Sequence, residues 1–213
     1  MSGANLIIIA GPNGAGKSTI GKSLIPEYQV EIFDFDKEYY SIWAKFGFDP
    51  AVRSGCLDRA SEKFNQEFKL ALRNKKSFCF ETNYHTKTVL KYREQAKKEG
   101  FYCHLIFVGL ESPELAKERV TKRVQLNGHF VPDKEVEERY SAGLSSLSES
   151  FHLYDKVEIM ESLPDYHLKT CIVIEAGKGL LIQKPKFLHS IPKLEESIKN
   201  FEKKVDKNRG LSK

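Results

Sequence analysis

A glycine-rich loop at residues 11–18, set between an apolar run and a predicted helix, constrains this chain more than any other feature. The apolar run Leu6–Ile9 predicts a buried strand directly before the loop. The loop reads G-x-x-x-x-G-K-S, and its residues with the one that follows are Gly11, Pro12, Asn13, Gly14, Ala15, Gly16, Lys17, Ser18 and Thr19. Glycine lets the backbone turn tightly, so that N–H groups approach phosphate oxygens near a helix amino terminus. Residues 11–19 therefore predict a site for a nucleoside triphosphate.

Two side chains at the end of the loop predict how the site would act. Lys17 is expected to reach the β- and γ-phosphates, and the Ser18 hydroxyl is expected to bind Mg²⁺. The alternative is a plain glycine-rich turn, and the strand–loop–helix context argues against it. We therefore expect Mg²⁺ and either ATP or GTP as cofactors, and these residues do not distinguish the two nucleotides.

The composition is that of a globular protein without a membrane segment. Apolar residues make up 40% and charged residues 30% of the 213 residues, and no apolar run approaches the roughly 18 residues that span a bilayer. The amino-terminal MSGANL leads straight into the first predicted strand, so we expect no signal peptide and a cytoplasmic location. The four separated cysteines are expected to be buried, reduced thiols.

The net charge is +5, and lysines near the carboxyl terminus contribute to it. No aromatic residues are interleaved with the lysines of residues 199–213, which favours a solvated tail over an arm that binds nucleic acid. We expect one kinase-like domain over residues 1–192, with a core at 5–161, and a helical, Lys-rich tail at 193–213.

Predicted strands alternate with predicted helices along the core. The expected strands are 5–10, 30–34, 77–82, 102–109 and 156–161, and the expected helices are 17–25, 37–48, 54–72, 86–99, 113–126 and 134–148. A β-hairpin is expected at about 170–183. This rhythm predicts a three-layer α/β/α fold of the P-loop NTPase type, with a mainly parallel five-stranded sheet and a carboxyl-terminal hairpin and helix.

Polar residues follow four of the predicted strands. The loop follows the first strand, Asp34 and Asp36 follow the second, Glu81 and Thr82 end the third, and Glu111 follows the fourth. Ligands of parallel sheets bind at the carboxyl ends of the strands. We therefore expect these residues to meet at one edge and form an active site.

Phosphoryl transfer to a hydroxyl requires a carboxylate that accepts the hydroxyl proton. Asp36 is our candidate base, because it follows a strand that we expect to adjoin the loop. Its alternative role is a helix amino-terminal cap. Asp34 lies on the same side of the strand by period two, and is either a contact to Mg²⁺-bound water or structural. Glu81 ends an apolar strand and needs a partner, which is a metal-bound water, a substrate hydroxyl, Lys17 or a structural ion pair.

Arg119 and Arg123 are four residues apart and share one helix face, directly before the break at residues 127–129. Arginines beside a loop of this kind can close over the γ-phosphate as a lid. Arg139 of the next helix could join them, and His129 is a loop residue that could also act directly. The alternative is a solvated basic face. The fourth strand does not end in the aspartate of a motor ATPase, which favours a small kinase.

With these residues placed, the chain resembles the zeta-toxin family of P-loop kinases in its small stand-alone form. The resemblance covers about residues 5–161. It rests on Gly11–Thr19, Asp36, Phe80–Thr82, Leu110–Val124, Gly128–Pro132 and Arg139-Tyr140. It implies that Asp36 is the catalytic base, that Lys17 and Ser18 hold the nucleotide and Mg²⁺, and that Glu81 and Thr82 face the acceptor. Arg123, with Arg119 and Arg139, would form the cationic lid.

Characterised zeta toxins phosphorylate a sugar hydroxyl of UDP-N-acetylglucosamine and are often held inactive by an antitoxin. The resemblance therefore implies a small-molecule acceptor and a possible antitoxin partner. The chain departs from the family pattern at Asp34, at Asn83–His85, at Ser141-Ala142 and at Glu161-Ser162. Most departures lie on the acceptor side, which we assign to Asp34, Glu81, Thr82, Asn83, His129 and Arg139.

The sequence therefore predicts a small-molecule kinase, an enzyme that transfers the γ-phosphate to an alcohol group of a small acceptor such as a nucleotide sugar. A second hypothesis is a polynucleotide or nucleoside kinase, for which Tyr39, Tyr40, Trp43 and Lys45 would supply an aromatic, basic track. Packing of these rings within a helix is the favoured interpretation, so we do not expect nucleic acid as a partner. A third hypothesis is a nucleotide-gated binding module without catalysis.

Overall fold

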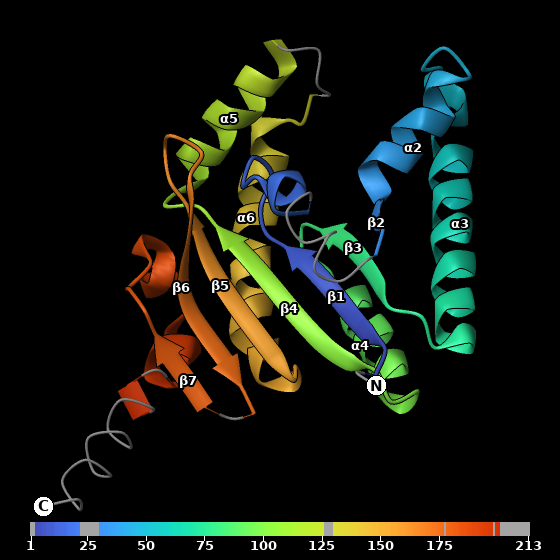
Figure 1. The fold of residues 1–213 in the computed structure, drawn as a ribbon. Helices are drawn as coiled ribbons and strands as arrows, with labels where there is room; N and C mark the ends of the chain where they lie inside the picture. Colours follow the sequence, from blue (N-terminus) through green and yellow to red (C-terminus); the bar gives the residue numbers. More distant parts are fainter. Residues whose placement is uncertain (1–2, 22–29, 126–129, 177, 198, 201–213) are drawn as a thin grey trace, which may run out of the picture.

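One seven-stranded sheet, in the order β2-β3-β1-β4-β5-β6-β7, organises the chain (Figure 1). The structure is a computed structural model that describes residues 3–21, 30–125, 130–176, 178–197 and 199–200. The parallel strands are β1 (Asn5–Ala10), β2 (Ile32–Asp34), β3 (Phe78–Thr82), β4 (Tyr102–Gly109) and β5 (Lys156–Ser162). The antiparallel strands are β6 (Leu168–Glu175) and β7 (Lys178–Leu181).

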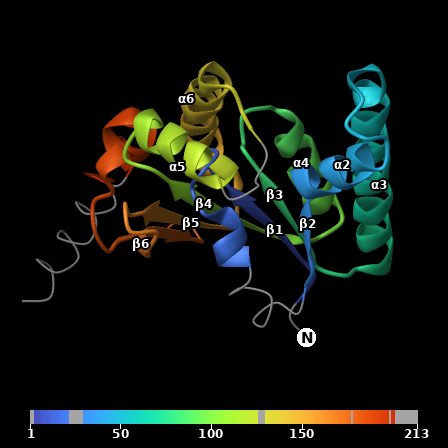
Figure 2. The ribbon, with the colours of Figure 1, turned by 90° about the horizontal axis from the view of Figure 1, so that it is seen from above.

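Helices cover both faces of this sheet. The α-helices are α2 (Phe35–Ala44), α3 (Arg53–Asn74), α4 (Thr88–Lys98), α5 (Pro113–Gln125) and α6 (Asp133–Ser150). The short 3₁₀ helices are η1 (Pro50–Val52), η2 (Phe151–Leu153) and η3 (Lys186–Ser190). Seen from above, α4 and α6 lie on one face, and the helical residues 17–21 lie on the other (Figure 2). Residues 192–197 and 199–200 are helical as predicted, and residues 22–25 and 201–205 lie outside the described residues.

The predicted fold class is confirmed, with one difference in the sheet. The expected hairpin is β6–β7, and it does not stand apart from the five parallel strands. It continues the sheet, because β6 pairs antiparallel with β5 from Lys156↔Glu175 to Ser162↔Leu168. This pairing uses hydrogen-bonding groups that an edge strand would leave open. The five strands expected in the core therefore become seven.

The position of β2 corrects two predictions. This strand pairs with β3 and not with β1, so it lies at the edge of the sheet and does not adjoin the strand before the loop. Helix α2 begins at Phe35, and the side chain of Asp34 accepts a hydrogen bond of 3.0 Å from the backbone N–H of Lys37. Asp34 is therefore the helix cap, and Asp36 lies in the first turn of the helix instead of on the strand.

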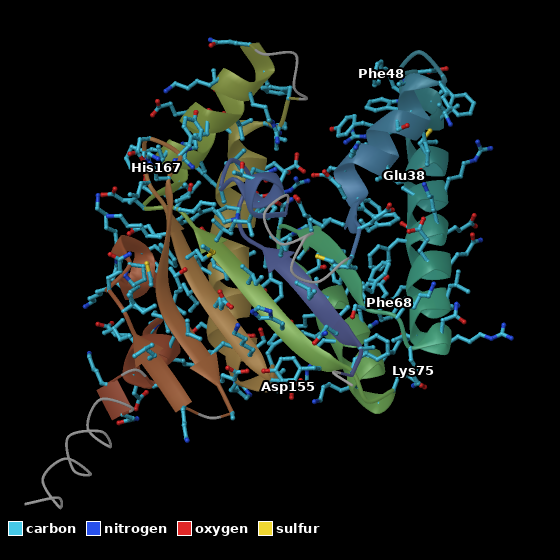
Figure 3. The ribbon with its side chains drawn as sticks, viewed as in Figure 1. Glu38, Phe48, Phe68, Lys75, Asp155 and His167 are labelled. Atoms are coloured by element: carbon cyan, nitrogen blue, oxygen red, sulfur yellow. The ribbon has the colours of Figure 1, made fainter. Side chains whose placement is uncertain are left out.

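Aromatic rings fill the space between α3 and the edge of the sheet. Phe64 of α3 lies edge-on to Phe80 of β3, with ring centroids 5.2 Å apart, and Phe68 packs against Phe78 at 5.6 Å. Figure 3 shows Phe68 pointing from α3 toward the sheet. These contacts follow from the helical spacing of apolar residues in α3. All four cysteines are buried free thiols, as predicted.

Ionic contacts hold the edge of the sheet that lies opposite the loop. Asp155 accepts hydrogen bonds from Lys97 of α4 (2.7 Å) and from the backbone N–H of Cys103 (2.7 Å) at the start of β4. Lys75, which ends α3 in a left-handed conformation, pairs with Glu99 at 2.6 Å. Asp155 and Lys75 both lie at the lower edge in Figure 3. This edge is therefore occupied by contacts between elements.

Residues after β7 close the far side of the sheet. Phe187 of η3 is fully buried, and its ring lies where a Cβ on Gly109 would stand, 2.2 Å from the ring carbon Cζ. Glu161 accepts from the backbone N–H of Lys186 (2.9 Å), and the side chain of Lys186 pairs with Glu111 (2.6 Å). Glu111 was expected at the active site, and this ion pair assigns it instead to the attachment of η3.

Replacing Phe187 by Ala should lower the free energy of unfolding by about 3–5 kcal/mol, because a fully buried ring is lost against β4. Phe130→Ala is a matched control, since that ring is 67% exposed and should cost within about 0.5 kcal/mol. Urea unfolding followed by circular dichroism measures both. Equal effects of the two substitutions would contradict the role of Phe187.

Candidate active site

A cleft of about 1270 Å³ opens between α2 and α5, beside the loop that follows β1. In Figure 1 these two helices rise on either side of the carboxyl end of β1. The residues that line the cleft are Asn13, Gly14, Gly16, Lys17, Ser18, Thr19, Asp34, Asp36, Lys37, Tyr40, Ser41, Trp43, Phe48, Glu81, Arg119, Lys122, Arg123 and Tyr166. Most residues predicted from the loop and from the lid helix therefore meet in one place.

The loop bends where only glycine fits. A Cβ on Gly11 would stand 2.2 Å from the backbone oxygen of Val108 in β4, so the chain crosses that strand without a side chain. Gly14 has φ +78°, and a Cβ there would stand 3.0 Å from the Cβ of Arg119. The first helical turn follows at residues 17–21. This combination of tight backbone and helix start suits a phosphate group.

Lys17 is held across the loop by three acceptors. Its ammonium donates to the backbone oxygens of Gly11 (2.9 Å) and Pro12 (3.1 Å) and to the side-chain oxygen of Asn83 (3.2 Å). Burial lowers the pKa of Lys17, while the charges of Glu81 and Asp36 oppose that shift. The cation therefore lies in a site that already contains carboxylates, and an anionic ligand would add to its stabilisation.

Ser18 and Glu81 form a pair at the mouth of the cleft. The Ser18 hydroxyl donates to Glu81 at 3.2 Å, and the register of the sheet sets Glu81 beside Ile9 of β1 and Asp34 of β2. Burial raises the pKa of Glu81, and the charge of Asp34 adds to this, whereas Lys17 opposes it. A hydroxyl next to a crowded carboxylate is a donor set that suits a hard cation such as Mg²⁺.

The protein alone offers few ligands for such an ion. Among the residues that the structure describes, no three His, Cys, Asp or Glu side chains are grouped to hold a metal. This agrees with the usual habit of Mg²⁺, which keeps several waters and takes substrate phosphates as ligands beside one or two protein groups. The Ser18–Glu81 pair fits that kind of partial site.

Asp36 projects into the same cleft from the first turn of α2. It is half-buried, and it lines the cleft together with Lys17 and Glu81. Burial raises the pKa of Tyr40, one turn further along α2, and the charge of Asp36 raises it further. Asp36 thus lies within electrostatic range of both Lys17 and the Tyr40 hydroxyl, although its strand does not adjoin β1.

Arg119 is a buried support of the loop. The side chain is 4% exposed, which excludes the solvated basic face that was its alternative. Its guanidinium donates to the backbone oxygen of Gly14 (3.0 Å), to the hydroxyl of Ser162 (2.7 Å) and to the backbone oxygen of Leu163. Arg119 therefore ties the loop to the end of β5, and it still lines the cleft.

The other predicted lid residues do not all lie in the cleft. Arg123 lines the cleft, and it is the charge that, after burial, lowers the pKa of Lys17, so it lies within electrostatic range of that ammonium. Arg139 pairs with Glu135 one turn back on α6. Burial lowers the pKa of the His85 side chain, and Arg139 lowers it further, so Arg139 faces the segment after β3. His129 lies outside the described residues.

The segment after β3 explains one departure from the expected pattern. Thr82 accepts a hydrogen bond from the backbone N–H of Tyr84 (3.0 Å), and the Thr82 backbone oxygen accepts from Gly11 (3.2 Å). Tyr84 has φ +59° and is buried, with its hydroxyl bonded to Ser150 (2.7 Å) and Tyr154 (2.8 Å). Thr82 therefore shapes the turn, and Asn83 reaches the loop through Lys17.

The sequence did not identify the two ends of the cleft. Lys37, Ser41 and Phe48 were not candidates. The rings of Tyr40 and Trp43 pack against Tyr39 of the same helix as predicted, with centroids 4.8 Å and 5.6 Å apart, and they line the cleft as well. The helical spacing of 36, 40 and 43 could have placed them on one face with Asp36. Tyr166, in the turn between β5 and β6, carried no signal, because its position depends on contacts with Arg119.

Among the described residues, no helix has the length and apolar character needed to cross a membrane.

Proteins with similar sequences include an uncharacterized protein of Haemophilus influenzae. It is 28% identical over 134 residues, which cover 63% of this chain and 91% of that protein. A shikimate kinase of Chromohalobacter salexigens is 58% identical over 65 residues, which cover 28% of this chain and 34% of that enzyme. The second match is too short to carry the activity of the whole enzyme.

Solved structures share the fold and a family model identifies the chain. A structure from the PezAT toxin–antitoxin system of Streptococcus pneumoniae matches with a TM-score of 0.61 and 16% identity, over 78% of this chain and 71% of that one. The AvrRxo1-ORF1:-ORF2 complex matches with a TM-score of 0.63 and 13% identity, over 89% of this chain and 63% of that one. These identities show the fold alone. The model of the Zeta toxin family matches residues 4–162, which is most of the chain, and the protein therefore belongs to the zeta-toxin family.

Proposed function

We propose that this protein is a Mg²⁺-dependent kinase that transfers the γ-phosphate of ATP or GTP to a hydroxyl of a small acceptor. The observation that carries the proposal is the cleft itself, which holds the phosphate loop, the Ser18–Glu81 pair and the Asp36 carboxylate together. Membership of the zeta-toxin family supports a nucleotide-dependent, kinase-like activity. A nucleotide-gated module without catalysis would have no use for a carboxylate opposite Lys17.

In this proposal Asp36 acts as the general base. It accepts the proton of the acceptor hydroxyl as that oxygen forms a bond to the γ-phosphorus, and the bond from the γ-phosphorus to the bridging oxygen breaks to release the nucleoside diphosphate. Lys17 would exchange its contacts with the oxygens of Gly11 and Pro12 for phosphate oxygens. Arg123, in electrostatic range of Lys17, would stabilise the charge on the migrating group.

Ser18 and Glu81 would hold the metal ion with the nucleotide. Mg²⁺ supplies charge neutralisation of the β- and γ-phosphates when it is bound. The hydroxyl of Ser18 would hold the ion, and Glu81, which already contacts that hydroxyl, would help to hold it in place. In motor ATPases an aspartate at the end of a strand helps to hold the metal ion. The fourth strand of this chain has no such aspartate, so Glu81 would take that role.

The acceptor would lie along α2. From Asp36 the wall of the cleft continues through Tyr40 and Trp43 of α2 to Phe48 in the turn after the helix, so aromatic rings follow the candidate base along this wall. Such rings bind planar bases and the apolar faces of sugars. Lys37 on the same wall suits an anionic group of the acceptor. A nucleotide sugar such as UDP-N-acetylglucosamine satisfies all three features.

The same aromatic wall favours a second candidate function, a nucleoside or polynucleotide kinase, because stacked bases would also fit it. A polynucleotide acceptor would bind with an affinity that falls steeply as salt is added, whereas a nucleotide sugar would show a weak dependence.

We also propose an antitoxin as a protein partner, since the PezAT structure that shares this fold comes from a toxin–antitoxin system.

Replacing Asp36 by Asn should abolish phosphoryl transfer and leave nucleotide affinity within about twofold, because the side chain keeps its size and loses its basicity. The assay incubates the protein with γ-labelled ATP and a metabolite extract, and identifies the labelled product by mass. Lys17→Ala should lose both binding and transfer, and Asp58→Asn, an exposed residue of α3, is the matched control. Full turnover by Asp36→Asn would exclude it as the base.

Replacing Glu81 by Gln should stabilise the ligand-free protein and weaken Mg²⁺-nucleotide binding. The folded-state pKa of Glu81 is raised above 4.5, so its charged form destabilises the fold as the pH rises above that value. The gain should be absent below about pH 4.5 and present at pH 7 in urea unfolding. Glu158→Gln is the control of opposite sign, because hydrogen bonds from His104 and Lys156 lower the pKa of Glu158 to about 2. A loss of stability in both variants at pH 7 would contradict this assignment.

Replacing Phe48 by Ala should raise the KM for the acceptor about tenfold and leave the KM for the nucleotide unchanged, because a stacking surface far from the loop is lost. Phe46→Ala is the matched control. Its ring is 43% exposed against 52% for Phe48, it lies two residues away, and it does not line the cleft. Steady-state kinetics with the identified acceptor decide between them, and equal KM values for the two variants would exclude the aromatic wall as the acceptor site.

A further inference from the structure

Tyr166 occupies a turn that holds its ring in a defined position. The turn between β5 and β6 is closed by hydrogen bonds from the Tyr166 N–H to the Leu163 oxygen (2.8 Å) and from the Leu163 N–H to the His167 oxygen (2.8 Å). Asp165 accepts from the backbone N–H of His167 (3.2 Å). Tyr166 itself has φ +69°, a left-handed conformation that is costly for tyrosine and has to be maintained by its surroundings.

The ring of Tyr166 covers the guanidinium of Arg119. The guanidinium carbon lies 4.5 Å from the centroid of the ring, within the range of a cation–π contact. Arg119 is buried, and its Nη1 donates to Gly14 and Ser162 while its Nη2 donates to Leu163. The ring is therefore attached, through one arginine, to the backbone of the phosphate loop.

The other face of this residue is open to the cleft. Tyr166 is 54% exposed, and it lines the cleft beside Gly14 and Gly16. A large aromatic side chain that is fixed on one face and open on the other is a stacking surface for a planar group. The left-handed backbone conformation of Tyr166 does not serve to bury its ring in the core, since more than half of the residue is in solvent.

The triphosphate determines which planar group would reach Tyr166. Lys17, Asn83 and Asp36 mark the end of the cleft where the γ-phosphate would lie. Tyr166 follows β5, which lies on the opposite side of β1 from β3 and β2. The labelled residues Phe48 and His167 accordingly lie on opposite sides of the upper part of the molecule in Figure 3. The nucleoside end of a bound triphosphate would therefore leave the loop toward Tyr166 and away from α2.

We propose that Tyr166 is the platform on which the base of the phosphate donor stacks, and that Arg119 is the positioning residue that holds this platform against the loop. This inference rests on the proposed kinase function. The backbone groups of Leu163 and the carboxylate of Asp165 are already engaged within the turn. The platform therefore recognises the face of the base and not its edge, and adenine and guanine nucleotides gain equally from it.

The test compares ligands with and without a base. Calorimetric titration of the full chain with Mg-ATP, Mg-GTP and inorganic tripolyphosphate should show that Tyr166→Ala weakens both nucleotides by about ten- to a hundredfold and leaves tripolyphosphate within about twofold. Tyr166→Phe should restore nucleotide affinity, because it keeps the ring. Lys17→Ala should weaken all three ligands, because it acts on the phosphates.

The outcomes separate the platform from the kinase function. If Tyr166→Ala binds ATP as tightly as the unmodified protein, or loses tripolyphosphate as strongly as ATP, the platform is excluded. A loss for ATP that spares GTP would overturn recognition by the face of the base. If the unmodified protein binds neither ATP nor tripolyphosphate, the proposed kinase function fails and the platform fails with it.

Discussion

The phosphate loop is clamped from two sides, and the rest of the site depends on that clamp. On one side, the carboxyl end of β3 contacts the loop through the Thr82 backbone oxygen, the Asn83 side chain and the Glu81 carboxylate. On the other side, Arg119 ties Gly14 to the end of β5. A loop that is fixed in this way loses its conformational entropy during folding, so this loss does not weaken ligand binding. Each proposed role in the cleft assumes that fixed frame.

The clamp also divides the cleft into two functional halves. The α5 side carries Arg119, Arg123 and the turn with Tyr166, and it would face the nucleotide. The α2 side carries Asp36 and the aromatic rings, and it would face the acceptor. The departure from the family pattern at Asn83–His85 belongs to this second half, and its buried Tyr84 is bonded to residues of α6 and beyond. A change in that segment therefore alters packing as well as the surface offered to a substrate.

Local patterns were sufficient to predict much of this fold. The loop, its flanking strand and helix start, and the strand β4 follow from residue types at fixed spacing. The order of the strands does not, because the pairing of β2 with β3 and of β6 with β5 depends on contacts between distant segments. The sequence offered Asp36 as a helix cap, whereas the cap in the structure is Asp34, two residues earlier. The reason is local, since either aspartate could start α2. Tyr166 was missed because its ring is positioned by Arg119, which is distant in sequence.

The bond between Arg119 and the loop has a consequence for how the chain folds. Gly14 and Arg119 are 105 residues apart in the sequence, and Leu163 follows Arg119 by a further 44 residues. The contact order of the site is therefore high, and such contacts form late because long loops have to close first. A chain emerging from the ribosome would carry an incomplete nucleotide site until most of its length had been synthesised. The topology itself therefore postpones assembly of the site until Leu163 has been synthesised.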